Sequence, residues 1–157
     1  MSRHAASAGV PCFRFERPAW PLKPGWISVA TTLAALECLP PSARAFVTIG
    51  RKEIEPYFAR ADISGIARMI EPPSGDVPPH WHLILARPPF TVASERQLMA
   101  DHGITHLVAK NAGGGQTQAK LVAAAESNVQ VLMVARPLKA PVPTFATLQQ
   151  LRKMLSP

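Results

Sequence analysis

The sequence predicts an α/β fold, in which a parallel sheet is covered by helices on both faces. At 157 residues the chain has the size of one ordinary domain, and 47% of its residues are hydrophobic, which is enough for a buried core. From Arg44 onward, short apolar segments alternate with segments of helical pattern. Continuously apolar strands that alternate with helices are typical of a parallel sheet buried on both faces.

The strands are predicted from apolar runs that turn-forming or charged residues interrupt. Five runs meet this description: AFVTIG (45–50), GIARMIEPP (65–73), WHLILARPPF (81–90), THLVAK (105–110) and VQVLMVARP (129–137).

The helices are predicted between these strands and after the last one. Pro56 falls in the first turn of one helix, where its missing N–H is tolerated. In another helix, Ser94 is expected as the N-cap and Gly103 as the C-terminal stop. The predicted helices span residues 52–60, 93–103, 117–127 and 144–155.

The first 42 residues differ from the rest of the chain. CFRFERPAW (12–20) alternates like a strand, but RPAWPLKPGW (17–26) and LPPSA (39–43) are punctuated by proline and are typical of a connector. The sequence therefore divides into two parts. Residues 1–42 are interpreted as a tail or the remnant of another domain, followed by a connector, and residues 43–157 as an α/β domain.

The composition points to a soluble chain with an anionic partner. No run of about 18 uncharged apolar residues exists to span a membrane, and no apolar core follows the first residues as in a secretory signal. Cys12 and Cys38 are too few for a disulfide framework or a metal site. We therefore expect a cytoplasmic protein without a membrane partner.

The net charge of +7 comes from 17 basic and 10 acidic residues. Nucleic-acid binders usually gather such charge in runs or interleave it with aromatic residues, and this chain does neither. Five cations stand singly near the ends of apolar segments: Arg51, Arg68, Arg87, Lys110 and Arg136. Any one of them could be ordinary solvated surface. In parallel sheets, however, ligands bind at the carboxyl ends of the strands, and all five are expected there.

Three consecutive glycines, Gly113 to Gly115, lie between a predicted strand and a predicted helix that contains Lys120 near its start. A helix N-terminus has unsatisfied N–H groups and a partial positive charge, and glycine lets an anion approach the backbone. The bend therefore suits a phosphate, although it has neither the P-loop order nor the G-x-G-x-x-G pattern. Two alternatives remain open, a bend chosen for turn geometry and Thr117 as a helix N-cap.

The segment TIGRKE (48–53) forms a second junction of this kind. Gly50 can adopt a positive φ, and Arg51 and Lys52 place two cations at a helix start, where they oppose the helix dipole. This unfavourable placement suggests that they serve a bound anion, while Glu53 partly offsets them.

Catalytic constellations are missing from the sequence. His80 and His82 would share one face of a strand, but no acidic or cysteine partner completes a metal site. No G-x-S-x-G elbow or Cys/His nucleophile pattern occurs. A cofactor that supplies the chemistry, bound and oriented by the protein, fits this pattern better. The sequence designates no catalytic residue.

Five motifs in this order, TIGRKE, ARMIEPP, ILARPPF, LVAKNAGGGQTQAKLVAA and VLMVARP, resemble those of the precorrin-6A reductase family. Upstream, AGVPCFRFERPAW resembles the end of that family's first half. The resemblance implies a Rossmann-like fold and NADPH-dependent reduction of precorrin-6A, a carboxylate-fringed tetrapyrrole, to precorrin-6B in cobalamin biosynthesis. It also implies that residues 1–42 are a remnant of the N-terminal domain, most of which is lacking, and that residues 43–157 are the nucleotide-binding domain. Either the chain is a natural truncation or its start is assigned too late, and its activity is expected to be impaired.

The resemblance implies two groups of site residues. For NADPH it implies Gly50, Arg51, Lys52, Lys110, Asn111, Gly113, Gly114, Thr117 and Lys120. For the tetrapyrrole it implies Arg68, Arg87, Phe90 and Arg136, for which structural ion pairs at strand ends are the alternative. Pro88 departs from the family pattern, in which glycine is usual, and removes one backbone N–H. Two alternative functions remain, a non-catalytic module that binds anions or nucleotides and, less favoured, a nucleic-acid-binding protein.

Overall fold

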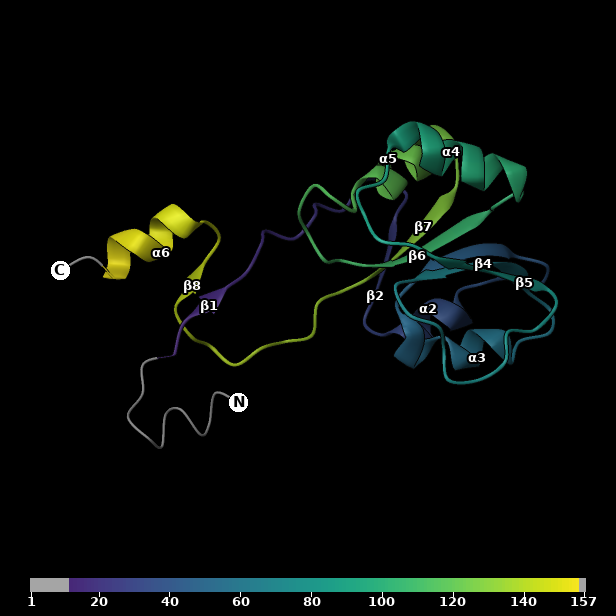
Figure 1. Ribbon diagram of the computed structural model, residues 1–157, viewed down its shortest axis with the longest axis horizontal. Coiled ribbons are helices and arrows are strands. Elements are labelled where there is room, and N and C mark those ends of the chain that lie inside the picture. The colour runs from purple at the N-terminus through teal and green to yellow at the C-terminus, as the bar shows by residue number, and fades with distance from the viewer. Residues whose placement is uncertain (1–11, 156–157) are drawn as a thin grey trace.

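The computed structural model describes residues 12–155, and its centre is a sheet of six parallel strands. The strands lie in the order β2-β7-β6-β3-β4-β5 (Figure 1). The predicted α/β class is confirmed, and β3 to β7 correspond to the five predicted strands. Their bounds are β2 Ile27–Val29, β3 Arg44–Thr48, β4 Ser64–Met69, β5 Trp81–Leu85, β6 His106–Lys110 and β7 Gln130–Val134.

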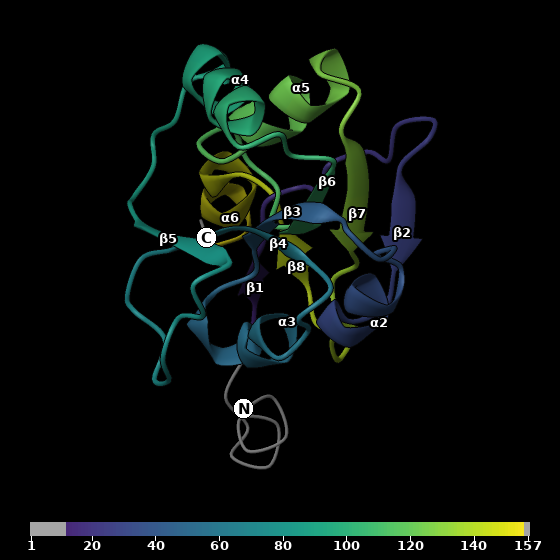
Figure 2. The same ribbon diagram turned by 90° about the vertical axis from the view of Figure 1, so that its right-hand side faces the viewer.

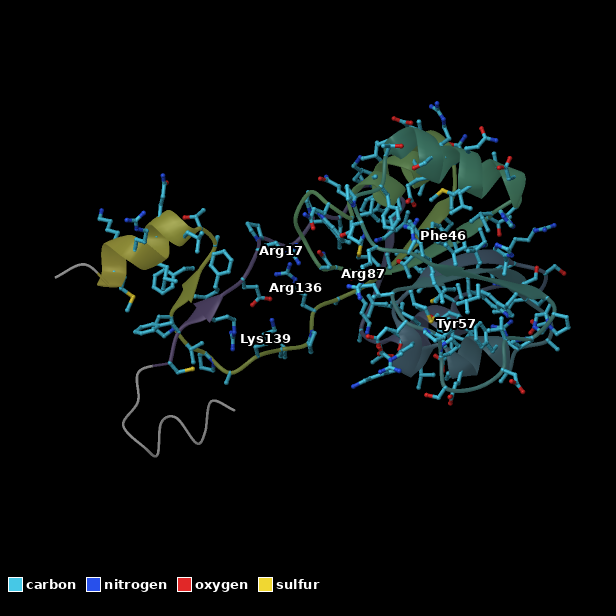
Figure 3. The ribbon with its side chains drawn as sticks, viewed as in Figure 1. Arg17, Phe46, Tyr57, Arg87, Arg136 and Lys139 are labelled. Atoms are coloured by element: carbon cyan, nitrogen blue, oxygen red, sulfur yellow. The ribbon has the colours of Figure 1, made fainter. Side chains whose placement is uncertain are left out.

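Helices cover both faces of the sheet, with α2 and α3 on one face and α4 and α5 on the other (Figure 2). Because successive side chains of a strand point to opposite faces, β3 supplies both layers of the core. Val47 packs with Tyr57 in the α2/α3 layer, and Phe46 packs in the α4/α5 layer (Figure 3). The bounds are α2 Thr32–Glu37, α3 Glu55–Phe58, α4 Val92–Asp101 and α5 Ala119–Glu126.

Strand β2 and helix α2 were not predicted. Ile27 to Val29 pair in parallel with Leu132 to Val134 of β7, and the side chain of Thr31 caps α2 by accepting from the Ala34 N–H. A three-residue strand between proline-rich segments has too few residues to show a period. Residues 27–37 thus belong to the six-stranded unit, whereas the division of the chain into domains at residues 42 and 43 stays a prediction.

Helix boundaries differ from the predictions in several places. Thr91, not Ser94, is the N-cap of α4, and Ser94 completes a reciprocal capping box with it, which is why the serine looked like a cap. The predicted helix 52–60 is a 3-10 turn η1 (Arg51–Glu53) followed by α3, with Pro56 at its start. Gly103 has a φ of +56° directly after the α4 C-cap His102, as expected for a helix stop.

A second, smaller unit lies apart from the six-stranded sheet (Figure 1). The strands β1 (Arg14–Phe15) and β8 (Thr144–Phe145) pair in parallel, and α6 (Leu148–Leu155) follows β8. The predicted helix 144–155 is therefore a short strand followed by a helix. Two connecting segments carry this unit away from the six-stranded sheet (Figure 1). Arg17, Arg136 and Lys139 lie along these segments (Figure 3).

Candidate functional site

A cleft of about 550 Å³ lies at the carboxyl edge of the sheet. Its volume is within the range of small-molecule and cofactor sites, about 300–1,000 Å³. The segments after β3, β4, β5 and β6 contribute its walls, because the carboxyl ends of parallel strands meet at one edge. Seven of the predicted site residues line it: Gly50, Arg51, Arg68, Arg87, Phe90, Thr117 and Lys120.

Arg68 lines the cleft and forms a buried ion pair. Its guanidinium donates to both carboxylate oxygens of Glu95 in α4, at 2.6 and 3.0 Å, and the two side chains are 7% and 1% exposed. The same guanidinium lies between two rings, 4.8 Å from the centroid of Phe46 and 3.7 Å from that of Phe90. These contacts favour the alternative interpretation of Arg68, in which it forms a structural ion pair.

Arg51 and Arg87 lie at the rim of the cleft. Arg51 pairs with Glu71 at 3.1 Å, and both side chains are about half exposed. Arg87 is exposed and has no hydrogen bond or ion pair with any residue from 12 to 155. Gly50 has a φ of +91° with open space around its Cα, so a ligand can approach its backbone. Lys52, beside them, is exposed and outside the cleft lining.

Lys120 is a buried amine in the first turn of α5. The residue is 8% exposed and lines the cleft, and its Nζ lies 5.9 Å from the centroid of the Trp20 ring. Within residues 12–155 this ammonium has no hydrogen bond or ion pair. Burial lowers the pKa of Lys120 to about 8, with the positive charge of Arg68 acting in the same direction and the carboxylate of Glu95 opposing it.

The triple-glycine bend has a different environment. Gly113 and Gly114 have φ values of +68° and +80° and are absent from the cleft lining. A Cβ on Gly113 would overlap the carbonyl oxygen of Pro18 and lie 2.5 Å from Arg136 Nη2. Glycine is therefore required here for close packing of the chain's own segments, and a nucleotide contact at the bend stays a prediction.

The segment before β2 is fastened to this bend by polar contacts. Asn111 accepts from the Trp20 N–H at 2.8 Å and donates to the Trp20 carbonyl at 3.0 Å. Trp20 Nε1 donates to the Gly114 carbonyl at 2.9 Å. Arg136 donates to the carbonyl oxygens of Asn111, Ala112 and Arg17 and pairs with Glu16. The amide of Asn111 and the guanidinium of Arg136 are thus engaged in holding the chain together.

A second, smaller cleft of about 280 Å³ borders β6 and β7. Lys110, Asn111 and Arg136 line it, and Lys110 pairs there with Glu53. Ten of the thirteen predicted site residues therefore line two clefts at one sheet edge, whereas Lys52, Gly113 and Gly114 line neither. Thr117 is not the N-cap of α5, because the helix starts at Ala119 and its cap, Gln118, makes no side-chain capping bond.

Three contributors to the site were not predicted: Glu95, Glu71 and Trp20. Glu95 lies 27 residues after its partner Arg68, and Trp20 lies in the proline-rich connector, so no local pattern marked them. Glu95 could have been suspected as a partner of Arg68, because it is an acidic residue in a helix expected to pack on the sheet that contains this cation. Among the described residues, no three His, Cys, Asp or Glu side chains gather as a metal site, and no helix is long and apolar enough to cross a membrane.

The chain is similar to members of one known protein family. The model of the family described as precorrin-6x reductase CbiJ/CobK matches residues 1–156. Precorrin-6A reductase of Rhodococcus erythropolis is 43% identical over 144 residues, covering 87% of this chain and 58% of that protein. The Rhodobacter capsulatus enzyme of that name is 36% identical over 157 residues, covering 95% and 62%. A solved structure of CobK precorrin-6A reductase matches with a TM-score of 0.88 at 35% identity, covering 98% of this chain and 63% of that one. The chain thus spans about 60% of the length of these relatives.

Proposed function

Because the chain belongs to the precorrin-6x reductase family CbiJ/CobK, we propose that it binds NADPH at the carboxyl edge of its sheet and takes part in reducing precorrin-6A to precorrin-6B in cobalamin biosynthesis. The observation that supports this most is the convergence on one cleft of residues from four connections, Gly50, Arg51, Arg87 and Lys120 among them.

The cleft fits a phosphorylated dinucleotide in chemical terms. The open backbone at Gly50 and the start of α5 offer N–H groups to phosphate oxygens, and Thr117 can add a hydroxyl. Arg51 can exchange its half-exposed partner Glu71 for a phosphate, since a guanidinium binds phosphate in a bidentate manner. Lys52 and Lys110 add positive charge along the same edge.

The substrate side of the proposal rests on Arg87 and Phe90. Arg87 is the exposed cation of the cleft without a partner among residues 12–155, and it is therefore suited to a carboxylate of the macrocycle. Phe90 offers a ring face, and Arg68 keeps that ring in place through its contact at 3.7 Å. Arg136 would act indirectly by holding the bend after β6.

The cofactor, when bound, supplies hydride to a ring double bond. The residues of the chain bind and orient both partners and neutralise their negative charge. A cation at the wall of a cleft attracts a negative charge more strongly than a cation in bulk water does, because the effective dielectric constant is lower near the protein.

Titration of the 157-residue chain with NADPH and with NADH tests the proposal. We expect NADPH to bind more tightly, and Arg51→Ala and Lys110→Ala each to weaken NADPH binding about tenfold, corresponding to about 1.4 kcal/mol for one charged contact. Arg96→Ala serves as the control, because Arg96 is an exposed cation of α4 that pairs with Glu126.

Unchanged affinity in both variants would remove the site assignment. NADPH binding without a change in the absorbance of added precorrin-6A would instead favour the non-catalytic nucleotide-binding module.

A further inference from the structure

The burial of the Lys120 ammonium is not required for binding a phosphate. Its ammonium is buried beside Trp20 and lines the cleft without a hydrogen bond or ion pair among residues 12–155. An amine whose task is to neutralise phosphate benefits from a permanent charge, which arginine supplies best. Here two arginines, Arg51 and Arg87, already line the same cleft. The buried lysine is therefore unexplained by anion binding alone.

We propose that Lys120 is the proton donor of the reduction, acting as a general acid from the lining of the cleft toward the macrocycle. This role rests on the proposed function, because it completes that reaction: saturation of a conjugated double bond requires one hydride and one proton. The Lys120 side chain is the ionisable group of the cleft lining that is buried, open to the cleft and unpaired within the described residues.

The step balances with the components that the proposed reaction supplies. A hydride from the reduced nicotinamide forms a C–H bond at one end of the double bond, and the electron pair moves into the conjugated system. An N–H bond of the Lys120 ammonium breaks, and the proton forms an N–H or C–H bond on the macrocycle. The nicotinamide is oxidised, the macrocycle is reduced, and the neutral amine regains a proton from solvent through the cleft.

The groups around Lys120 tune it for this task. The pKa of Lys120 is lowered to about 8 by burial and by Arg68, against the opposing charge of Glu95. Arg51, Glu71 and Arg87 also line the cleft. A general acid works best when its pKa lies near the working pH, so at pH 7 this amine carries its proton and releases it readily.

The burial of this ammonium also affects stability in a predictable direction. Because the pKa is lower in the folded chain than in the unfolded chain, folding disfavours the charged form, and stability rises as the pH increases from about 8 toward the ordinary lysine value. Lys120→Met removes that cost, so the variant is expected to be at least as stable at pH 7 as the parent chain. Loss of activity in this variant would then not reflect unfolding.

The test compares Lys120→Arg and Lys120→Met with Lys23→Arg in the 157-residue chain. Lys23 is the matched control, because it lies over Trp26 at 5.8 Å but is exposed and outside the cleft. We expect Lys120→Arg to keep NADPH affinity within about threefold and to lower single-turnover reduction of precorrin-6A by about 10²–10⁴-fold, the usual effect of losing a general acid. Lys23→Arg should match the parent in both measurements.

A readout that does not depend on turnover completes the test. Titration of ¹³C-dimethylated lysines by NMR, with the Lys120 signal assigned by its loss in Lys120→Arg, should give a pKa of about 8 for Lys120, well below the ordinary lysine value. A normal midpoint, or reduction by Lys120→Arg at the parent rate, would overturn this role alone. A parent chain without NADPH affinity would overturn the proposed function and this role with it.

Discussion

Replacing Glu95 by alanine is expected to lower the free energy of unfolding by about 3–5 kcal/mol, because it leaves the Arg68 guanidinium buried without its counter-charge. Both side chains are almost fully buried, and the carboxylate accepts both hydrogen bonds at 2.6 and 3.0 Å. The rings of Phe46 and Phe90 attract the cation but cannot accept its hydrogen bonds in place of a carboxylate. Urea unfolding followed by circular dichroism measures the effect.

Glu126→Ala is the matched control for this prediction. Glu126 pairs with Arg96 at 3.5 Å on the surface, where both side chains are about half exposed, so its loss should cost at most about 1 kcal/mol. Replacing both buried partners, as in Arg68→Met with Glu95→Leu, should restore most of the stability, because no charge is then left unpaired. Equal effects of Glu95→Ala and Glu126→Ala would show that the buried pair does not stabilise the fold in this way.

The helices and strands that could be predicted are those whose local hydrophobic pattern matches their burial in the folded chain. Strand β3 is apolar on both faces because helices cover both, and its run of Ala45, Phe46 and Val47 already indicates this. Strand β2 gave no such signal. Ile27 and Ser28 are exposed at the edge of the sheet, and only pairing with β7 makes the segment a strand.

The same distinction holds for the candidate site. The cations at strand ends could be predicted, because parallel strands bring their carboxyl ends to one edge whatever the details of packing. Their partners could not be predicted. Whether Arg51 lies free or beside Glu71, and whether Trp20 covers Lys120, depends on contacts between segments far apart in the chain.

At the triple-glycine bend, one reason for the glycines lies in a distant segment that the local sequence pattern does not reveal. The sequence indicated that bare backbone is needed at Gly113 and Gly114, and the positive φ values agree. The structure adds that the space beside Gly113 is filled by Pro18 and Arg136. Both a nucleotide contact and close packing demand glycine, so residue type alone cannot separate them.

Replacing Gly113 by alanine is therefore expected to lower the free energy of unfolding by about 2–5 kcal/mol. Two costs add, because alanine disfavours the left-handed backbone of this residue and its Cβ overlaps the Pro18 carbonyl oxygen. Gly115→Ala is the control, because open space surrounds that residue. The local effect can be followed through hydrogen exchange of the Trp20 amide, which donates to Asn111 Oδ1 at 2.8 Å and should exchange faster in Gly113→Ala.

NADPH titration of the same variant separates the two roles of the bend. If Gly113 serves packing, the Trp20 amide loses protection, and any loss of affinity follows from the displaced segment, since Trp20 also contacts Lys120 in the cleft. If the backbone of Gly113 contacts the nucleotide directly, affinity falls while the Trp20 amide keeps its protection. The geometry favours the first outcome, because a Cβ on Gly113 meets the Pro18 carbonyl before it can meet any ligand in the cleft.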